Sequence, residues 1–280
     1  MSIELPEAKI LARQMNKELP GKRIKTYHLK DYERLQRIGF LNKDIRSFDL
    51  LVDREIRSIV SRGNAIHVKL DCEVNLLLNP EYGGKIFHHI SDLATPDKFH
   101  LRIDFKDNTT LTVRLTSMGS IYVMKNNDLK YSYIFQRNFN PMLLSPIDER
   151  FNFQSFSELI ESKNRMLKSV LVGKDAFIVG ISNSTFQDII YRARLHPERK
   201  AADLSVDEIL VLYNAIKLVI GERIRLNGKD QFYDLYGNQG RYTPAMGPNM
   251  KQTPCSVCET IIEKISIGGG HVYFCPKCQK

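Results

Sequence analysis

The sequence predicts an α+β protein of several domains, with a leading helix on an N-terminal β-sandwich, a helical region and a C-terminal zinc finger. Two observations predict this fold class. The hydrophobic period changes from helical to alternating and back to helical, and four of the five cysteines lie near the C-terminus. Hydrophobic residues make up 42 % of the 280 residues and charged residues 26 %, which is usual for a globular chain with a buried core.

The first region, residues 1–135, combines one helix with several strands. Apolar residues recur at three- and four-residue steps in "ELPEAKILARQMNKELPG", which ends at Pro20 and Gly21 as an amphipathic helix does. Apolar and polar residues alternate in "AIHVKLD" and in "FHLRIDFKDNTTLTVRL". Short strands joined by tight turns predict a β-sandwich, in which we expect Cys72 to be a small buried hydrophobe.

The rest of the chain divides into a linker, a helical region and a tail. Two prolines among polar residues make residues 136–150 a linker. Residues 151–230 have the helical period, and capping boxes are expected at "SFSE" and "SVDE". Residues 231–280 are expected to form a loop that leads into the finger.

The four cysteines near the C-terminus are spaced as in a structural zinc site. They form two Cys-x-x-Cys pairs separated by 16 residues, namely Cys255, Cys258, Cys275 and Cys278. Two disulfides are the alternative, and the lack of an apolar export segment after Met1 argues against them. Four thiolates close the coordination tetrahedron of Zn²⁺, so we expect one structural zinc ion that does no chemistry itself.

The charge of the chain points to a polyanionic partner. Lysine and arginine number 41 against 32 acidic residues, which gives a net charge of +9. Such a balance favours nucleic acid as the partner. The sequence has no apolar stretch of the length that a membrane span needs, about 18 residues, so we expect no membrane association.

Several strings stand at matching places along the chain. They are "ELPE" at residues 4–7, "VGISN" at 179–183 followed by "STFQDIIYRARLHPERKAADLS", and "GGGHVYFCPKCQ" near the end. Together they resemble the formamidopyrimidine-DNA glycosylase/endonuclease VIII family of base-excision repair. The resemblance implies a glycosylase-like sandwich and a helix-two-turn-helix DNA-binding domain in residues 151–230. It also implies a protein that bends double-stranded DNA, flips a damaged base, cuts its glycosidic bond and nicks the strand.

The resemblance also implies which residues contact DNA. Asn183 matches the family's asparagine at a helix N-terminus, where backbone N–H groups can face a phosphate. Asn64 stands where the family has a lysine in the first sandwich hairpin, and His271 follows Gly270 at the place of the finger arginine. Basic residues beyond the Asn183 helix add positive charge, namely Arg192, Arg194, Arg199 and Lys200.

The catalytic end departs from the family pattern. Family members use the amine of an N-terminal proline followed by glutamate, and Ile3 takes the place of that proline. Removal of Met1 would expose the primary amine of Ser2, which can form a Schiff base, with Glu4 as its acid/base partner. We expect catalysis by Ser2 and Glu4 to be weak or absent beside ordinary members.

Two functions therefore stay open. One is a DNA glycosylase and abasic-site lyase with altered activity, and the other is a non-catalytic member that binds damaged, abasic or bent DNA. A zinc-ribbon protein that binds RNA or associates with the ribosome is a third alternative. Paired aromatic residues on an arginine-rich platform for single strands would favour it, and the sequence shows no such pairs. For a repair protein we expect a monomer in the cytoplasm, associated with the nucleoid in a bacterium. The loop between about 228 and 254 gives no legible code for the lesion.

Overall fold

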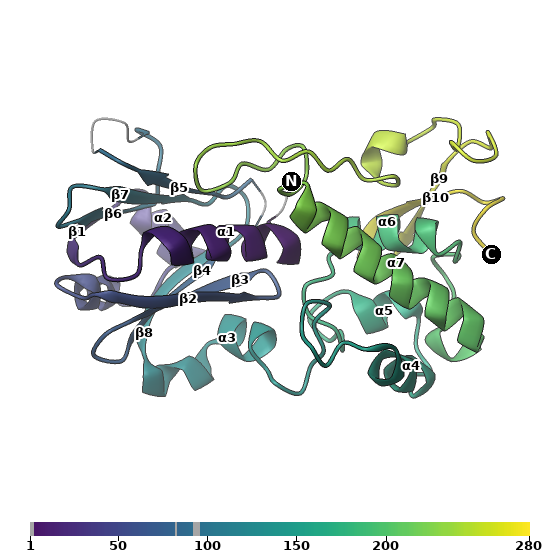
Figure 1. The fold of residues 1–280 in the computed structure, drawn as a ribbon, viewed down its shortest axis with the longest axis horizontal. Coiled ribbons are helices and arrows are strands. Elements are labelled where there is room, and N and C mark those ends of the chain that lie inside the picture. The colour runs from purple at the N-terminus through teal and green to yellow at the C-terminus, as the bar shows by residue number, and fades with distance from the viewer. Residues whose placement is uncertain (1–2, 82, 92–95) are drawn as a thin grey trace. The chain divides into compact units, whose positions relative to one another are not determined.

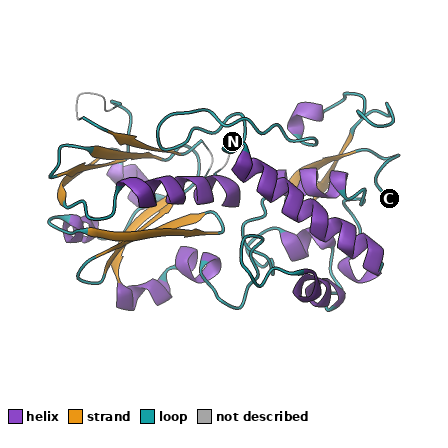
Figure 2. Ribbon diagram, in the orientation of Figure 1, coloured by secondary structure: helices purple, strands orange, loops and turns teal. Residues whose placement is uncertain are grey.

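The computed structural model describes residues 3–81, 83–91 and 96–280. Two compact units make up the chain, and each consists of two stretches: 1–140 with 224–241, and 141–223 with 242–280. Figure 1 shows the path of the chain, and Figure 2 shows strands mainly in the first unit and helices mainly in the second. The contiguous domain boundaries expected from the sequence remain a prediction.

The first unit is a sandwich of two four-stranded antiparallel sheets, which confirms the predicted β-sandwich. The sheets have the strand orders β1-β6-β7-β5 and β2-β3-β4-β8. The strands are β1 (Ile24–Leu29), β2 (Ile56–Arg62), β3 (Ala65–Leu70), β4 (Val74–Asn79), β5 (Lys85–His89), β6 (Leu101–Phe105), β7 (Thr110–Arg114) and β8 (Ser120–Lys125). The short helical elements of this unit are α2 (Tyr32–Arg37), η1 (Ile45–Leu51), η3 (Asn126–Tyr131) and α3 (Tyr133–Asn138).

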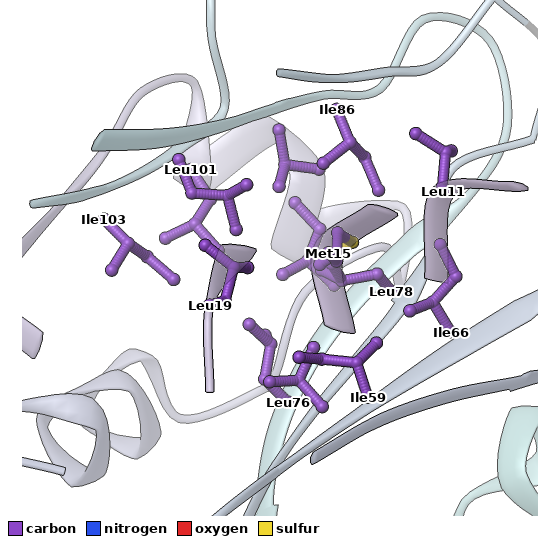
Figure 3. Close-up of a cluster of buried hydrophobic side chains, with 14 of the residues drawn as sticks. Leu11, Met15, Leu19, Ile59, Ile66, Leu76, Leu78, Ile86, Leu101 and Ile103 are labelled. Atoms are coloured by element: carbon purple, nitrogen blue, oxygen red, sulfur yellow. The ribbon is translucent and has the colours of Figure 1, made fainter. Parts of the chain in front are cut away.

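Helix α1 (Leu5–Glu18) shares one core with both sheets. Leu11 and Met15 of this helix and its capping residue Leu19 are fully buried. Figure 3 shows them beside apolar side chains of both sheets, among them Ile59, Ile66, Leu76, Leu78, Ile86, Leu101 and Ile103. Burial of each such side chain contributes about 1.5–3 kcal/mol, so tertiary packing rather than helix propensity holds α1 in place. The N-terminal end of α1, where Glu4 lies, is thereby positioned on the core.

Cys72 is exposed, so the expectation of a buried hydrophobe is wrong. The strand pattern ends at Leu70, and Cys72 lies in the turn between β3 and β4 with a positive φ of 51°. A turn residue in this conformation leaves the sheet, and its side chain does not join the core.

The second unit is helical apart from one hairpin. Its elements are α4 (Phe153–Glu161), α5 (Leu167–Leu171), α6 (Asn183–Arg192), η4 (Ala201–Asp203), α7 (Val206–Arg225, whose last two residues belong to the first unit), η5 (Pro248–Met250), β9 (Glu263–Ile267) and β10 (Gly270–Phe274). Among the described residues, no helix combines the length and the apolarity that crossing a membrane requires.

The two expected capping boxes have different outcomes. The box in "SVDE" is confirmed, since the Ser205 N–H donates to Glu208 Oε2 at 2.8 Å and the Glu208 N–H donates to Ser205 Oγ at 3.3 Å. The box in "SFSE" is wrong, because α4 begins earlier and Asn152 caps it by accepting the Ser155 N–H at 2.9 Å. Asparagine is as good an N-cap as serine, and here Asn152 rather than Ser155 caps α4.

Candidate functional site

The four cysteines of the predicted zinc site come together in the second unit. Their sulfur atoms all lie within 4.8 Å of one another, and the Cys255–Cys278 and Cys258–Cys275 pairs are 3.9 and 3.4 Å apart. Tetrahedral zinc with Zn–S bonds of about 2.3 Å separates its sulfur ligands by about 3.8 Å, so the donor set fits this metal. The cluster is a site for one structural zinc ion with four protein ligands.

Hydrogen bonds around the cysteines hold the finger on helix α6. The Tyr191 hydroxyl lies 3.3 Å from Cys255 Sγ. Gln187 accepts the Tyr273 N–H of β10 at 2.9 Å, and Gln279 donates to the Leu195 carbonyl at 2.9 Å. Outer contacts of this kind orient metal ligands, so α6 and the residues after it support the finger.

Asn183 and His271 meet at the tip of the finger hairpin. Asn183 Nδ2 donates to the His271 carbonyl at 2.8 Å. Gly268 and Gly269, between β9 and β10, have φ of +53° and +74°, the two-residue turn that favours glycine. A Cβ on Gly270 would lie 3.5 Å from the Asn183 amide. The helix N-terminus at Asn183 is therefore adjacent to the turn.

Lys168 completes this cluster, although no motif in the sequence points to it. The side chain of this α5 residue is buried, and its ammonium donates to the Ile267 carbonyl at the start of the turn. Burial lowers the pKa of Lys168. The side chain of Asn183 keeps one buried atom, Oδ1, for which the described part of the chain shows no hydrogen-bond partner. The Lys168 ammonium and the helix N-terminus together suit an anion such as a phosphate, whereas Asn183 Oδ1 is an acceptor and suits a donor.

Two of the basic side chains expected to add charge for DNA are engaged within the unit. Arg192 Nε donates to Asp188 at 3.0 Å. Arg199 makes a two-pronged ion pair with Glu208 at 2.8 and 3.0 Å. Such pairs neutralise the positive charge locally, so these arginines hold elements of the fold together rather than extend a free basic surface.

The N-terminal end of α1 forms a second polar cluster, in the first unit. Glu4 is the N-cap of α1 and forms a capping box with Glu7, whose carboxylate accepts the Glu4 N–H at 3.2 Å. Glu7 also accepts the backbone N–H of Lys229 at 3.2 Å, and Lys229 Nζ donates to Glu4 Oε1 at 2.6 Å. No motif in the sequence points to Lys229. Ser2 lies outside the described residues.

Asn64 lies in the tight turn between β2 and β3. Its side-chain amide donates to Glu81 Oε1 at 3.1 Å, and its backbone N–H donates to Asn138 at 3.3 Å. Burial raises the pKa of Glu81, and the Asn64 amide opposes that shift. To contact DNA, the Asn64 side chain would have to exchange its hydrogen bond with Glu81 for one with the nucleic acid. The DNA contacts of Asn64 and His271 stay predictions.

Three domain families match along the chain in the order of the observed fold. The formamidopyrimidine-DNA glycosylase N-terminal domain matches residues 3–118, the H2TH domain of the same glycosylase matches 143–232, and the zinc finger found in FPG and IleRS matches 253–280. The fold and the four-cysteine site thus define a two-unit protein with a sandwich, a helix-two-turn-helix domain and a zinc finger.

Whole-chain comparisons agree with the domain matches. A formamidopyrimidine-DNA glycosylase of Bacillus cereus is 26% identical, over 99% of this chain and 98% of its own length. One of Lactococcus lactis is 25% identical, over 99% of each. The structure of the Lactococcus lactis Fpg with DNA containing an abasic site has a TM-score of 0.82 at 22% identity, and MutM with DNA containing carbocyclic 8-oxo-G has 0.80 at 22%, each covering 99% of both chains. The chain belongs to the formamidopyrimidine-DNA glycosylase/endonuclease VIII family.

Proposed function

We propose that this chain is a repair protein that binds damaged or abasic double-stranded DNA as a monomer, in the cytoplasm or on the nucleoid. The observation that carries the proposal is the cluster of Lys168, Asn183 and the hairpin turn, which zinc and α6 hold together. Family membership supports it, since the Lactococcus lactis relative has been solved with abasic-site DNA. The net charge of +9 supports it too, because neutralising phosphates releases counterions and favours binding.

The proposed chemistry is cleavage at an abasic site through a Schiff base between a protein amine and the sugar. Glu4 is the proposed acid/base, because it is carboxylate-bearing, positioned at the α1 N-terminus and hydrogen-bonded to an amine. The amine of Ser2 remains the prediction from the sequence.

A non-catalytic DNA-binding protein is the second candidate function. Ile3 is only 2 % exposed, so an apolar core residue occupies the place of the family's reactive proline. Asn64 and His271, in place of a lysine and an arginine, hydrogen-bond Glu81 and Ser266. The apolar Ile3 at the nucleophile's place favours a protein that holds damaged DNA without cutting it, while the loss of charge at the other two places should lower its affinity for phosphates.

Binding to duplexes that differ at one position tests the proposal. Fluorescence anisotropy would compare an intact duplex with one containing a stable abasic analogue, at several salt concentrations. We expect tighter binding to the abasic duplex, since a weakened stack lowers the cost of bending and flipping by a few kcal/mol. Asn183→Ala should weaken both complexes about equally, and Lys168→Met should reduce the salt slope by about one.

The exposed Lys9 provides a matched control, because Lys9→Met removes the same charge from the first unit, to which the cluster does not belong. Its salt slope should equal that of the unmodified chain. Equal affinity for the intact and abasic duplexes would remove the damage preference, and no binding at low salt would end the DNA proposal.

A further inference from the structure

Lys229 and Glu4 form a buried ion pair between segments that are 225 positions apart in the sequence. The side chain of Lys229 is 9 % exposed and that of Glu4 is 2 % exposed, so the lysine is the more accessible partner. Among the described lysines, Lys229 and Lys168 are the buried ones, and Lys168 belongs to the other unit.

The backbone around Lys229 is closely packed. Its N–H donates to the buried carboxylate of Glu7. Gly228 has φ of +86°, and a Cβ there would approach the Phe232 ring to 2.5 Å. A Cβ on Gly240 would come within 2.2 Å of the Lys229 carbonyl. Such tight packing presents the lysine side chain to Glu4 on a preorganised support.

Stability alone does not explain this pair. Desolvation of two charges offsets much of their attraction, and replacing such a pair by apolar residues of similar volume is often neutral or stabilising. An amine beside a carboxylate is also an arrangement that Schiff-base chemistry can use, because the carboxylate can accept a proton from the attacking nitrogen and later return it.

The residue at the family's proline position cannot supply that nucleophile. The match to the glycosylase N-terminal domain begins at residue 3, where the chain has Ile3. The nitrogen of Ile3 is a peptide amide, which is not nucleophilic, and its side chain is part of the hydrophobic core. Within the described residues, Lys229 brings an amine into hydrogen-bond contact with Glu4.

We infer that Lys229 is the catalytic amine of this chain and attacks C1′ of an abasic deoxyribose, with Glu4 as its proton acceptor and donor. This inference rests on the proposed function. Glu4 takes a proton from the ammonium, and the free amine adds to the C1′ aldehyde. Glu4 then returns that proton to the former carbonyl oxygen, a second proton passes to this oxygen from the added nitrogen, and water leaves as the iminium forms.

Strand cleavage follows from the same pair. The Glu4 carboxylate removes a C2′ proton, the C3′–O bond breaks, and the 3′ phosphate leaves with the bonding electron pair. Water then hydrolyses the iminium, which releases the unsaturated aldehyde and restores the lysine amine. Every proton and electron pair is supplied by Lys229, Glu4, water or the DNA, so no other reactant is needed.

Borohydride trapping tests the inference, because hydride reduces the iminium to a stable covalent bond. The full-length chain would be trapped on abasic-site DNA, and the adduct mapped by peptide mass spectrometry. We expect the DNA remnant on Lys229. Lys229→Met and Lys229→Arg should each lower trapping by at least about 100-fold, as for loss of a nucleophile.

Lys229→Arg keeps the positive charge beside Glu4 and so separates chemistry from folding, while Lys9→Met controls for the loss of a lysine on α1. Abasic-duplex affinity of Lys229→Arg would be measured beside trapping, so that a loss of trapping larger than any loss of binding is assigned to the missing nucleophile. An adduct on the N-terminal peptide would overturn the inference in favour of the Ser2 amine. Abasic DNA bound with no adduct would also overturn it while leaving the binding function intact, and no DNA bound would count against the proposed function itself.

Discussion

Glu7 is the residue on which the polar cluster at the start of α1 depends most directly. It is fully buried, and its two carboxylate oxygens accept the backbone N–H groups of Glu4 and Lys229. One side chain thus fixes the N-cap of α1 and the segment that carries Lys229. A buried carboxylate in this position is a structural element of the proposed catalytic pair, although it need not touch DNA itself.

Glu7→Ala should therefore destabilise the first unit. Each buried N–H left without an acceptor costs roughly 1–3 kcal/mol, so we expect the free energy of unfolding of this unit to fall by about 2 kcal/mol or more. Native-state hydrogen exchange of β3 amides in the sandwich core would measure the change. Glu7→Gln retains one carbonyl acceptor, so its exchange protection should lie between that of Glu7→Ala and that of the unmodified chain. Unchanged hydrogen exchange in Glu7→Ala would contradict the role given to this carboxylate.

Sequence motifs predicted the site residues unevenly. The four cysteines follow from spacing, and Glu4 and Asn183 follow from strings that resemble the family. Lys168 and Lys229 could not be predicted, because a lone lysine is usually a solvated surface residue. Their partners, Ile267 and Glu4, lie far away in the sequence, and the fold alone brings them together.

At the scale of elements, the loop from 227 to 241 is organised by a single carboxylate. Asp234 accepts hydrogen bonds from the side chains of Gln14 and Asn227 at 2.9 and 3.0 Å, and from the backbone of Tyr236 and Asn238 at 3.0 and 2.8 Å. Burial disfavours the charged form, but these hydrogen bonds outweigh burial and lower the pKa of Asp234. The carboxylate thus ties the loop to α1.

This lowered pKa predicts that acid loosens the loop. A carboxyl group with a folded-state pKa below its unfolded value stabilises the fold above the unfolded pKa of about 3.9, and that stabilisation disappears as pH falls through the folded pKa. Hydrogen exchange of the Tyr236 and Asn238 amides, corrected for intrinsic rates, should lose protection as the pH falls below about 4. Asp234→Asn should be less protected at pH 6 and change less with pH; an identical profile in both proteins would contradict this reading.

Periodicity predicted most elements because each forms from local sequence. The helix α1, the strands β3, β6 and β7, and the capping box of α7 formed where the patterns indicated. The start of α4 could not be chosen from the sequence, since Asn152 and Ser155 are both good N-caps and packing of the helix decides between them.

At the scale of the whole molecule, the sequence predicted the fold class because cysteine spacing and hydrophobic period are strong local signals. It did not predict that residues 224–241 return to the first unit after the helices of the second. That return brings Lys229 to Glu4 and Asp234 to Gln14. Long-range pairings of this kind leave no periodic signal in a single sequence.

The division into two units predicts that removal of zinc acts on one of them. The core of the finger is small, with Met246, Ile262 and Tyr273 packed near the cysteines, so metal binding must supply much of its folding free energy. Cys258→Ser should lose zinc and the exchange protection of residues 253–280, and should weaken DNA binding because the contact of Asn183 with His271 depends on the folded hairpin. The β-sandwich should keep its exchange protection, because its core contains no part of the finger.

Elemental analysis would measure the zinc content, and hydrogen-exchange mass spectrometry would measure the protection of the finger and of the sandwich. Cys72→Ser is the matched control, since that exposed thiol lies outside the cluster and its loss should change neither quantity. Normal zinc content in Cys258→Ser would show that Cys258 is not needed to bind the metal. Unfolding of the sandwich together with the finger would show that the stability of the first unit also depends on zinc.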